Sequence, residues 1–162
     1  MSSHRPLHGN NAKVPADRLD LILDGTLESV DIAEKRIVRF CQRVGYSERQ
    51  RCEIGLAVRE SVANAILHGN CCDPKKKVML AAELRDAGVV ISVKDEGKGF
   101  DPRSLPNPLD PRNLLRESGR GVYLVKALMD KVTIRRLASC GMQVTMVKYL
   151  SKPKTALRRS TK

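Results

Sequence analysis

The sequence predicts an α+β fold, a two-layer sandwich in which helices cover one face of a mixed but mostly antiparallel sheet. Two observations support this prediction. Segments with strand and helix periodicity follow one another in the order strand, helix, helix, strand, strand, helix, strand, strand. Neighbouring strands are joined by short turns, as antiparallel strands are, which excludes a doubly wound parallel fold. A length of 162 residues suits one domain with its own core and is too short for two.

The first half of the chain predicts a tail, a strand and two helices. Residues 1–17 are polar and aperiodic, which is typical of a flexible terminus. A strand over 18–26 is predicted by three leucines that alternate with polar residues, Leu19, Leu21 and Leu23. A helix over 28–44 is predicted by apolar residues at helical spacing, Val30, Ala33, Ile37, Phe40 or Cys41, and Val44. Gly45 ends it, and a capping box predicts a second helix from Ser47 to about Leu67, with Gly69 beyond its end.

The second half predicts a hairpin, an irregular segment, a helix and two more strands. Apolar strands over 76–84 and 88–95 flank a turn. The long irregular segment that follows carries four prolines between Asp101 and Pro111, and such a segment inside a compact domain is expected to be functional or mobile. A helix over 121–130 and strands over 132–138 and 142–150 complete the domain. We therefore expect one domain over 18–151 and a basic C-terminal tail over 152–162.

Composition and charge exclude several function classes. No apolar run reaches the roughly 20 residues of a membrane-spanning helix, and the N-terminal residues lack the apolar segment of a secretory signal, so a cytoplasmic protein without a membrane span is expected. The net charge of +12 suggests nucleic acid as a partner. However, the basic residues are dispersed, without aromatic interleaving, zinc-finger spacing or a recognition helix. Direct nucleic-acid binding is thus a minor hypothesis, and an acidic protein partner would use the same charge.

The cysteines and histidines predict no structural metal site. The five cysteines are odd in number and form no C-x-x-C pair, so neither a disulfide framework nor a zinc site is indicated. The vicinal pair Cys71 and Cys72 has two interpretations, a sensor of oxidation or, as we prefer, two small reduced loop residues. His4 and His8 have metal-ligand spacing only in a helix, which the neighbouring proline and glycine oppose.

The helical stretch RESVANAILHGN carries polar groups in an apolar setting. Only Arg59 and Glu60 are charged in the second half of this helix, so most of it must be buried, and buried carboxylates need partners or a function. Glu60 and Asn64 are four residues apart and share one face, where their oxygens can orient a hydroxyl and hold Mg²⁺. A glutamate that only caps the helix or pairs with Arg59 or Arg51 explains the stretch equally well.

Two glycine-bearing stretches flank the irregular segment. In VKDEGKGFDP a strand delivers Asp95, and Gly97 and Gly99 free the backbone, so the carboxylate can accept from an exocyclic amine of a flat ring. The alternative is a plain turn, although no strand follows it. In ESGRGVYLV, Gly119 and Gly121 open a helix whose free amides suit an anion. A simple helix start made of small residues accounts for that stretch about as well.

Taken in order, the three stretches resemble the histidine-kinase-like ATPase superfamily of sensor kinases, gyrase-type ATPases and Hsp90. RESVANAILHGN resembles its N box, DEGKGF its first glycine box and GRGVYLV its second, and the resemblance spans residues 19–150. Within the superfamily, ExxxNAxxHG in a single small domain without a dimerisation helix resembles the bacterial anti-sigma-factor serine/threonine-protein kinases. This resemblance implies a protein that binds ATP with Mg²⁺ and sequesters a sigma factor. It also allows a homodimer. It also implies phosphorylation of a serine on an antagonist protein in a partner switch.

The resemblance implies a role for each matching residue. Glu60 is expected to act as the general base or to orient the attacking hydroxyl, and Asn64 to bind the Mg²⁺ that bridges the ATP phosphates. Asp95 is expected to accept from the adenine amino group, with Gly97 and Gly99 allowing close approach. Further nucleotide contacts are expected from His68, Arg116, Gly119, Arg120, Gly121 and Val122, with residues 100–118 as the ATP lid.

Two departures from the family pattern bear on catalysis. Glu117 stands where the family often has arginine, and either Arg116 or Arg120 can supply the charge that neutralises phosphate. Met142 follows Gly141 where the family has threonine, so a hydroxyl contact to phosphate is expected to be missing. These departures support a second hypothesis, a nucleotide-binding regulatory module that has lost kinase activity and acts only by binding proteins.

Overall fold

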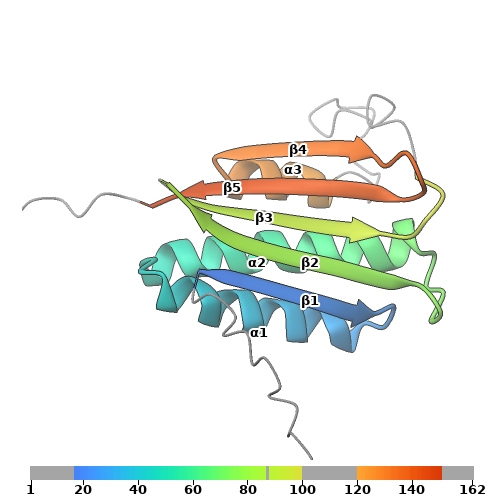
Figure 1. Cartoon of the computed structure of the whole chain (residues 1–162), viewed down its shortest axis with the longest axis horizontal. Coiled ribbons are helices and arrows are strands. Elements are labelled where there is room, and N and C mark those ends of the chain that lie inside the picture. Colours follow the sequence, from blue (N-terminus) through green and yellow to red (C-terminus); the bar gives the residue numbers. More distant parts are fainter. Residues whose placement is uncertain (1–16, 87, 100–119, 151–162) are drawn as a thin grey trace, which may run out of the picture.

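The fold contains a five-stranded sheet and three α-helices in the predicted order (Figure 1). It is seen in a computed structural model of the chain that describes residues 17–86, 88–99 and 120–150. In chain order the elements are β1 (Arg18–Asp24), α1 (Glu28–Arg43), α2 (Glu48–Asn64), a π-helical turn η1 (Ala65–Gly69), β2 (Lys77–Arg85), β3 (Gly88–Asp95), α3 (Arg120–Leu128), β4 (Lys131–Arg136) and β5 (Met142–Tyr149).

The sheet has the strand order β1-β2-β3-β5-β4. All of its pairings are antiparallel, so the described part of the sheet is wholly antiparallel rather than mixed. The three helices lie along one face of the sheet (Figure 1), which makes two layers and confirms the predicted α+β class. Because β5 inserts between β3 and β4, the end of β3 meets the start of β5 at one edge of the domain.

The core lies between the two layers. The helical stripe predicted for α1 is buried, with Ile37 wholly covered and both Phe40 and Cys41 inside. Every second residue of β3 faces the helices, and Val89, Ile91 and Val93 are at most 2% exposed. Each such side chain contributes about 1.5–3 kcal/mol when fully buried. Burial also raises the pKa of the Cys41 thiol to about 12, so this cysteine is an unreactive core residue at neutral pH.

The start of α2 agrees with the prediction, but its end does not. Ser47 and Gln50 form the capping box at the N-terminus. The α-helix stops at Asn64 and continues as the π-helical turn η1, which includes Gly69, so Gly69 lies inside the helical segment rather than beyond it. The widened turn is closed by a hydrogen bond from the Asn70 amide to the Ala65 carbonyl, 2.7 Å long.

Tyr46 joins the α1–α2 connection to the sheet, and its removal is expected to cost stability. Its hydroxyl accepts from the Val89 amide at 2.7 Å and donates to the Lys148 carbonyl at 2.5 Å. Because Tyr46→Phe leaves two buried backbone groups unpaired, we expect the free energy of unfolding to fall by about 1–3 kcal/mol. Urea denaturation measures this loss, and an unchanged midpoint would contradict the role.

The same residue predicts a pH dependence. Burial raises the pKa of Tyr46 from 10.0 to about 12. A raised folded-state pKa means that the neutral hydroxyl stabilises the fold fully below pH 10, and that this contribution is lost as the pH rises from 10 to 12. Tyr46→Phe should therefore flatten the stability profile in that window.

Candidate functional site

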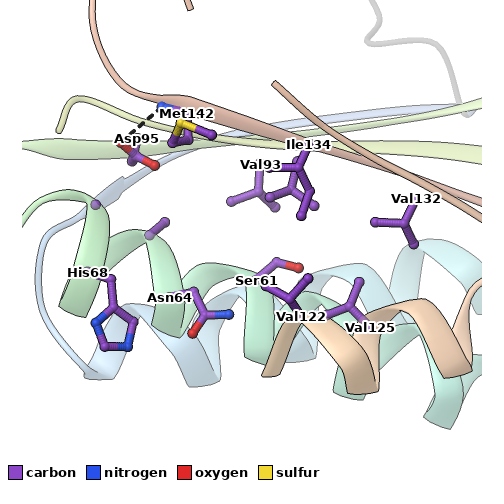
Figure 2. Close-up of a pocket in the computed structure, with 13 residues that line it drawn as sticks. Ser61, Asn64, His68, Val93, Asp95, Val122, Val125, Val132, Ile134 and Met142 are labelled. Atoms are coloured by element: carbon purple, nitrogen blue, oxygen red, sulfur yellow. Dashed lines mark hydrogen bonds between the residues drawn. The ribbon is translucent and has the colours of Figure 1, made fainter. Parts of the chain in front are cut away.

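A cavity opens between the sheet and the helices at the edge where β3 ends (Figure 2). Its volume is about 240 Å³, slightly below the roughly 300–1,000 Å³ of common small-molecule sites. Apolar side chains line most of it, Val93, Val122, Val125, Val132, Ile134, Met142 and Val144. Four polar side chains from three elements also line it, Ser61 and Asn64 from α2, His68 from η1 and Asp95 from β3. Such a space suits a flat, mostly apolar group with a few polar edges.

Asp95 presents one carboxylate oxygen to a ligand. Its Oδ1 accepts from the amides of Gly97 at 2.9 Å and Met142 at 3.2 Å. No donor among the described residues lies within hydrogen-bonding distance of its Oδ2. Only 5% of Asp95 is exposed, and this burial raises the pKa of its carboxyl above the usual value, although the two amides oppose the shift. Asp95 lines the cavity, so its Oδ2 can accept a hydrogen bond from a donor on a ligand.

Two glycines allow the chain to close around Asp95. A Cβ added to Gly69 would lie only 2.5 Å from the Asp95 Cγ, and one added to Gly97 would overlap the Gly69 carbonyl oxygen. Neither position has room for a side chain, so the π-helical turn and the residues after β3 meet backbone to backbone. The close approach of a flat ring to Gly97 stays a prediction, since the contact seen at this glycine is with the Gly69 carbonyl. Gly99, with a φ of +72°, lies beside Arg136 instead and does not line the cavity.

Asn70 holds the π-helical turn η1 and the strands β2 and β3 together at this point, although no pattern in the sequence assigns it a role. It is fully buried; its Nδ2 donates to the Lys77 carbonyl at 3.0 Å, and its Oδ1 accepts from the Glu96 amide at 2.9 Å. The side chain therefore ties the segment after η1 to the start of β2 and the end of β3. An asparagine directly after the last glycine of a helix was the available signal, but its partners are distant in sequence.

Asn70→Ala is expected to weaken both the fold and ligand binding at Asp95. Without the carboxamide, the Lys77 carbonyl and the Glu96 amide lose their hydrogen-bond partner, so the free energy of unfolding should fall by about 2–4 kcal/mol. Thermal unfolding with and without nucleotide measures both effects. A variant with the wild-type melting temperature would show that Asn70 does not hold these segments together.

The other end of the site joins α2 to the start of α3. A Cβ on Gly121 would lie 2.8 Å from the Glu60 Oε2 and 3.0 Å from the Asn64 Nδ2, so the first turn of α3 lies directly on these two side chains. Glu60, Asn64 and Gly121, predicted to act together, are thus brought together. Glu60 forms no hydrogen bond or ion pair with any described residue, and Arg59 pairs instead with Asp31 and Glu34 of α1. The simple pairing of Glu60 with a neighbouring arginine is therefore wrong.

The remaining predicted residues divide into three groups. His68 and Val122 line the cavity, and His68 is exposed at its rim. Arg120 is the first residue of α3 and is exposed. Arg116, Gly119 and the predicted lid over 100–118 lie outside the described residues.

Met142 lies at the Asp95 end of the cavity. Its amide donates to the Asp95 carboxylate, and its neighbour Gly141, with a φ of +85°, has no room for a Cβ, which would overlap the Asp95 backbone oxygen. The expected loss of a hydroxyl contact to phosphate at this position stays a prediction. In the part of the chain that the structure describes, no three metal-binding side chains cluster, and no helix is long and apolar enough to cross a membrane.

The α+β sandwich has a strand-end carboxylate and a helix-borne asparagine in the lining of one cavity, and Glu60 lies outside that lining, beside Gly121. This is the arrangement expected of an ATPase-type nucleotide-binding domain. Sequence comparison agrees, because the profile of the histidine kinase-like ATPase domain matches residues 23–148. The chain belongs to the histidine kinase-like ATPase family and, within it, to the group of serine-protein kinases and anti-sigma factors that includes the relatives below.

The relatives are small proteins of similar length. The chain is 30% identical over 141 residues to the anti-sigma F factor of Oceanobacillus iheyensis, covering 86% of this chain and 97% of that protein. It is 29% identical over 143 residues to the serine-protein kinase RsbW of Staphylococcus epidermidis, covering 84% and 89%. The serine-protein kinase RsbW of Bacillus subtilis is 28% identical over 142 residues, covering 84% and 88%.

A solved structure supports the fold. The crystal structure of the RsbU and RsbW domains of Rv1364c from Mycobacterium tuberculosis superposes with a TM-score of 0.63 at 24% identity. The match covers 84% of this chain and 33% of that longer chain. This match confirms the predicted fold, and the domain profile and the sequence relatives confirm the family predicted from the three sequence stretches.

Proposed function

We propose that the chain is an ATP-dependent protein serine kinase that also acts as an anti-sigma factor. It would bind a sigma factor and phosphorylate a serine of an antagonist protein, and phosphorylation would decide which partner is bound. The observation that carries this proposal is the closeness of Gly121 to both Glu60 and Asn64, which supports a helix start that binds an anion beside a carboxylate and a carboxamide suited to act as base and metal ligand.

The Asp95 end of the cavity suits an adenine ring. Valine, isoleucine and methionine side chains form apolar walls for its faces, and the Asp95 Oδ2 is available to the exocyclic amino group. A guanine carries a carbonyl oxygen at the corresponding position, which would meet this carboxylate oxygen without a shared proton. We therefore expect selection of adenine over guanine nucleotides, and Met142 contributes apolar surface at the base rather than a contact to phosphate.

The Gly121 end suits the phosphates. The first turn of α3 offers the positive end of the helix dipole, and glycine lets a phosphate approach its backbone closely. Glu60 lies beside this turn without a cation partner among the described residues, so its carboxylate is free to accept a hydroxyl proton or to orient the hydroxyl for attack. Phosphoryl transfer depends mainly on positioning and charge neutralisation, both of which this end of the site can provide.

The donor set fits Mg²⁺ only as an ion held mainly by phosphates. Asn64 offers one carboxamide oxygen beside Gly121, and no cage of three acidic, histidine or cysteine side chains exists in the described ranges. Mg²⁺ commonly binds through one or two protein oxygens together with substrate phosphates and water. When bound, the ion neutralises phosphate charge, while Asn64 orients it and Glu60 holds the proton of the acceptor hydroxyl.

Sigma-factor and antagonist binding are proposed from the relatives that are named anti-sigma F factor and serine-protein kinase RsbW. A protein that sequesters a sigma factor must work where transcription occurs, so we propose a cytoplasmic location. A homodimer is a further possibility that is consistent with the resemblance.

A pull-down from extract of the source cells, with and without ATP, followed by labelled γ-phosphate, tests this function. The proposal predicts capture of a sigma factor and of a second protein that becomes labelled on serine. The second candidate function, a regulatory module without kinase activity, is favoured by Glu117 at the position of a family arginine. It predicts ATP-dependent capture with no label on any partner.

A further inference from the structure

The C-terminal end of α3 is fastened to β5. The Lys148 Nζ donates to the carbonyl of Leu128, the last residue of the helix, at 2.6 Å. The Asp130 amide donates to the Val147 carbonyl at 3.0 Å, and the Asp130 Oδ2 accepts from the Tyr149 amide at 2.6 Å. A cation at a helix C-terminus also complements the helix dipole. This end of α3 therefore has a fixed position on the sheet.

The same lysine reaches α2. Its Nζ lies 2.7 Å from the Glu53 Oε2, with side-chain exposures of 12% for Lys148 and 21% for Glu53. Glu53 also accepts from the Arg49 Nε at 2.9 Å, and the pKa of Glu53 is lowered first by Lys148 and then by Arg49. One ammonium group thus joins three elements, β5, α2 and the end of α3. We call Lys148, Glu53 and the Leu128 carbonyl the lysine clamp.

The site lies at the opposite end of the same helix pair. Gly121, near the start of α3, contacts Glu60 and Asn64 near the end of α2, whereas the end of α3 meets Glu53 two turns earlier on α2. The helices therefore run in opposite directions. With 9 residues, α3 is about 13 Å long, so a shift at the clamp moves the whole short helix along α2.

We propose that Lys148 and Glu53 are positioning residues, which set where α3 lies along α2 and so place its first amides against the phosphates of bound ATP. This inference rests on the proposed function and extends it to residues outside the cavity. The clamp acts mainly on the Gly121 end of the site. Asp95 and Asn70 are held by β2, β3 and η1, and α3 reaches the rest of the cavity only through Val122 and Val125 of its lining. Loss of the lysine clamp should therefore weaken binding of the ATP phosphates more than binding of the adenine base.

Comparison of ATP with adenosine separates positioning from general loss of stability. Adenosine retains the base that meets Asp95 and lacks the phosphates that meet α3. We expect Lys148→Met to raise the dissociation constant for ATP about tenfold, since small displacements of binding groups are costly. The dissociation constant for adenosine should rise much less, because only Val122 and Val125 of α3 reach the base cavity. Lys148→Arg, which keeps the charge and donors for both partners, should restore most of the affinity, and Glu53→Gln should have a smaller effect than Lys148→Met.

Titration calorimetry on the full chain, below the melting temperature of every variant, provides the test. The matched control is Lys35→Met, the same substitution at an exposed lysine of α1, and it should leave both constants unchanged. Equal weakening of ATP and adenosine binding by Lys148→Met would assign the clamp a purely structural role and overturn the inference, as would no change in either.

Hydrogen exchange distinguishes failure of this inference from failure of the proposed function. Absence of ATP binding by the wild-type chain would refute the proposed function. In either case, Lys148→Met should accelerate amide exchange over residues 121–128 without ligand, and it should leave exchange in β2 and β3 unaltered. If amide exchange in α3 were unchanged in Lys148→Met, the proposed positioning role of the lysine clamp would be refuted even if the chain binds ATP.

Discussion

Replacement of Glu60 by glutamine is expected to lower the rate of phosphoryl transfer by about 10²–10⁴-fold, the usual contribution of a general base. Affinity for ATP should remain, because glutamine has the same shape beside Gly121 and the substitution leaves Asn64 and the cavity lining in place. The loss arises because a carboxamide cannot take the proton of the acceptor hydroxyl. Single-turnover transfer of labelled γ-phosphate to the antagonist protein measures the rate, and calorimetry measures ATP binding.

Glu48→Gln is the matched control for this experiment. Glu48 lies on the same helix, α2, but it is exposed whereas Glu60 is half-buried, and it lies in the first turn, at the far end of the helix from the site. We expect wild-type transfer from this variant. Wild-type transfer from Glu60→Gln would instead exclude Glu60 as the base, and loss of ATP binding in that variant would show that its effect is on the nucleotide rather than on the acceptor.

Replacement of Asp95 by asparagine is expected to raise the dissociation constant for ATP about 10²-fold, as expected when a buried donor–acceptor pair is broken. Asparagine keeps one oxygen for the amides of Gly97 and Met142, so the local structure should persist. Its Nδ2, however, would stand where the Oδ2 accepts, and two donors would face each other at the adenine amino group. The fold should survive while recognition of the base is lost.

The apo protein should become no less stable in this variant, for an electrostatic reason. Burial raises the pKa of Asp95 above 3.8, so the neutral acid is favoured in the folded state. A group with a raised folded-state pKa stabilises the fold below its unfolded pKa, and this contribution is lost as the pH rises through the folded value. At neutral pH the wild type therefore holds an unfavourable buried charge, which asparagine removes.

Thermal unfolding with and without Mg-ATP measures both effects of Asp95→Asn. The expected outcome is an apo melting temperature equal to or above that of the wild type, together with loss of the increase that ATP produces. If ATP still raised the melting temperature of Asp95→Asn as it does for the wild type, the adenine base would have to bind away from Asp95. For the wild type, ATP affinity should fall as the pH is lowered through the raised pKa of Asp95, because protonation converts the acceptor into a donor.

Local patterns in the sequence were sufficient to predict the elements of the fold. The leucine alternation of β1, the apolar stripe of α1 and the capping box at Ser47 each arise from residues close in sequence, and each is present in the structure. The Glu60–Asn64 pair was also predictable, since four-residue spacing on a helix places both side chains on one face. Its contact with Gly121 followed only from the resemblance to a family.

Features that depend on distant contacts were not predictable in this way. Asn70 gains its role from Lys77 and Glu96, and Met142 lies at Asp95 because β5 pairs with β3. The π-helical turn that brings Gly69 to Asp95 has no local signal, since Ala65 to Gly69 would fit an ordinary helix end. In each case a tertiary contact decided between local conformations that the sequence alone leaves equivalent.

The lysine clamp was missed for a related reason. Lys148 lies on a strand that alternates ordinarily, and a lysine near a strand end is usually a solvated residue. Only the packing of α3 between α2 and β5 buries its ammonium against a helix carbonyl and a carboxylate.

A crystal structure with Mg²⁺ and a non-hydrolysable ATP analogue tests the central claim most directly. Our account predicts the adenine amino group within hydrogen-bonding distance of the Asp95 Oδ2, the phosphates at the amides that begin α3, and Mg²⁺ on Asn64 with Glu60 beside the terminal phosphate. A nucleotide bound outside this cavity, or one bound with its phosphates at Asp95 and its base at Gly121, would contradict it.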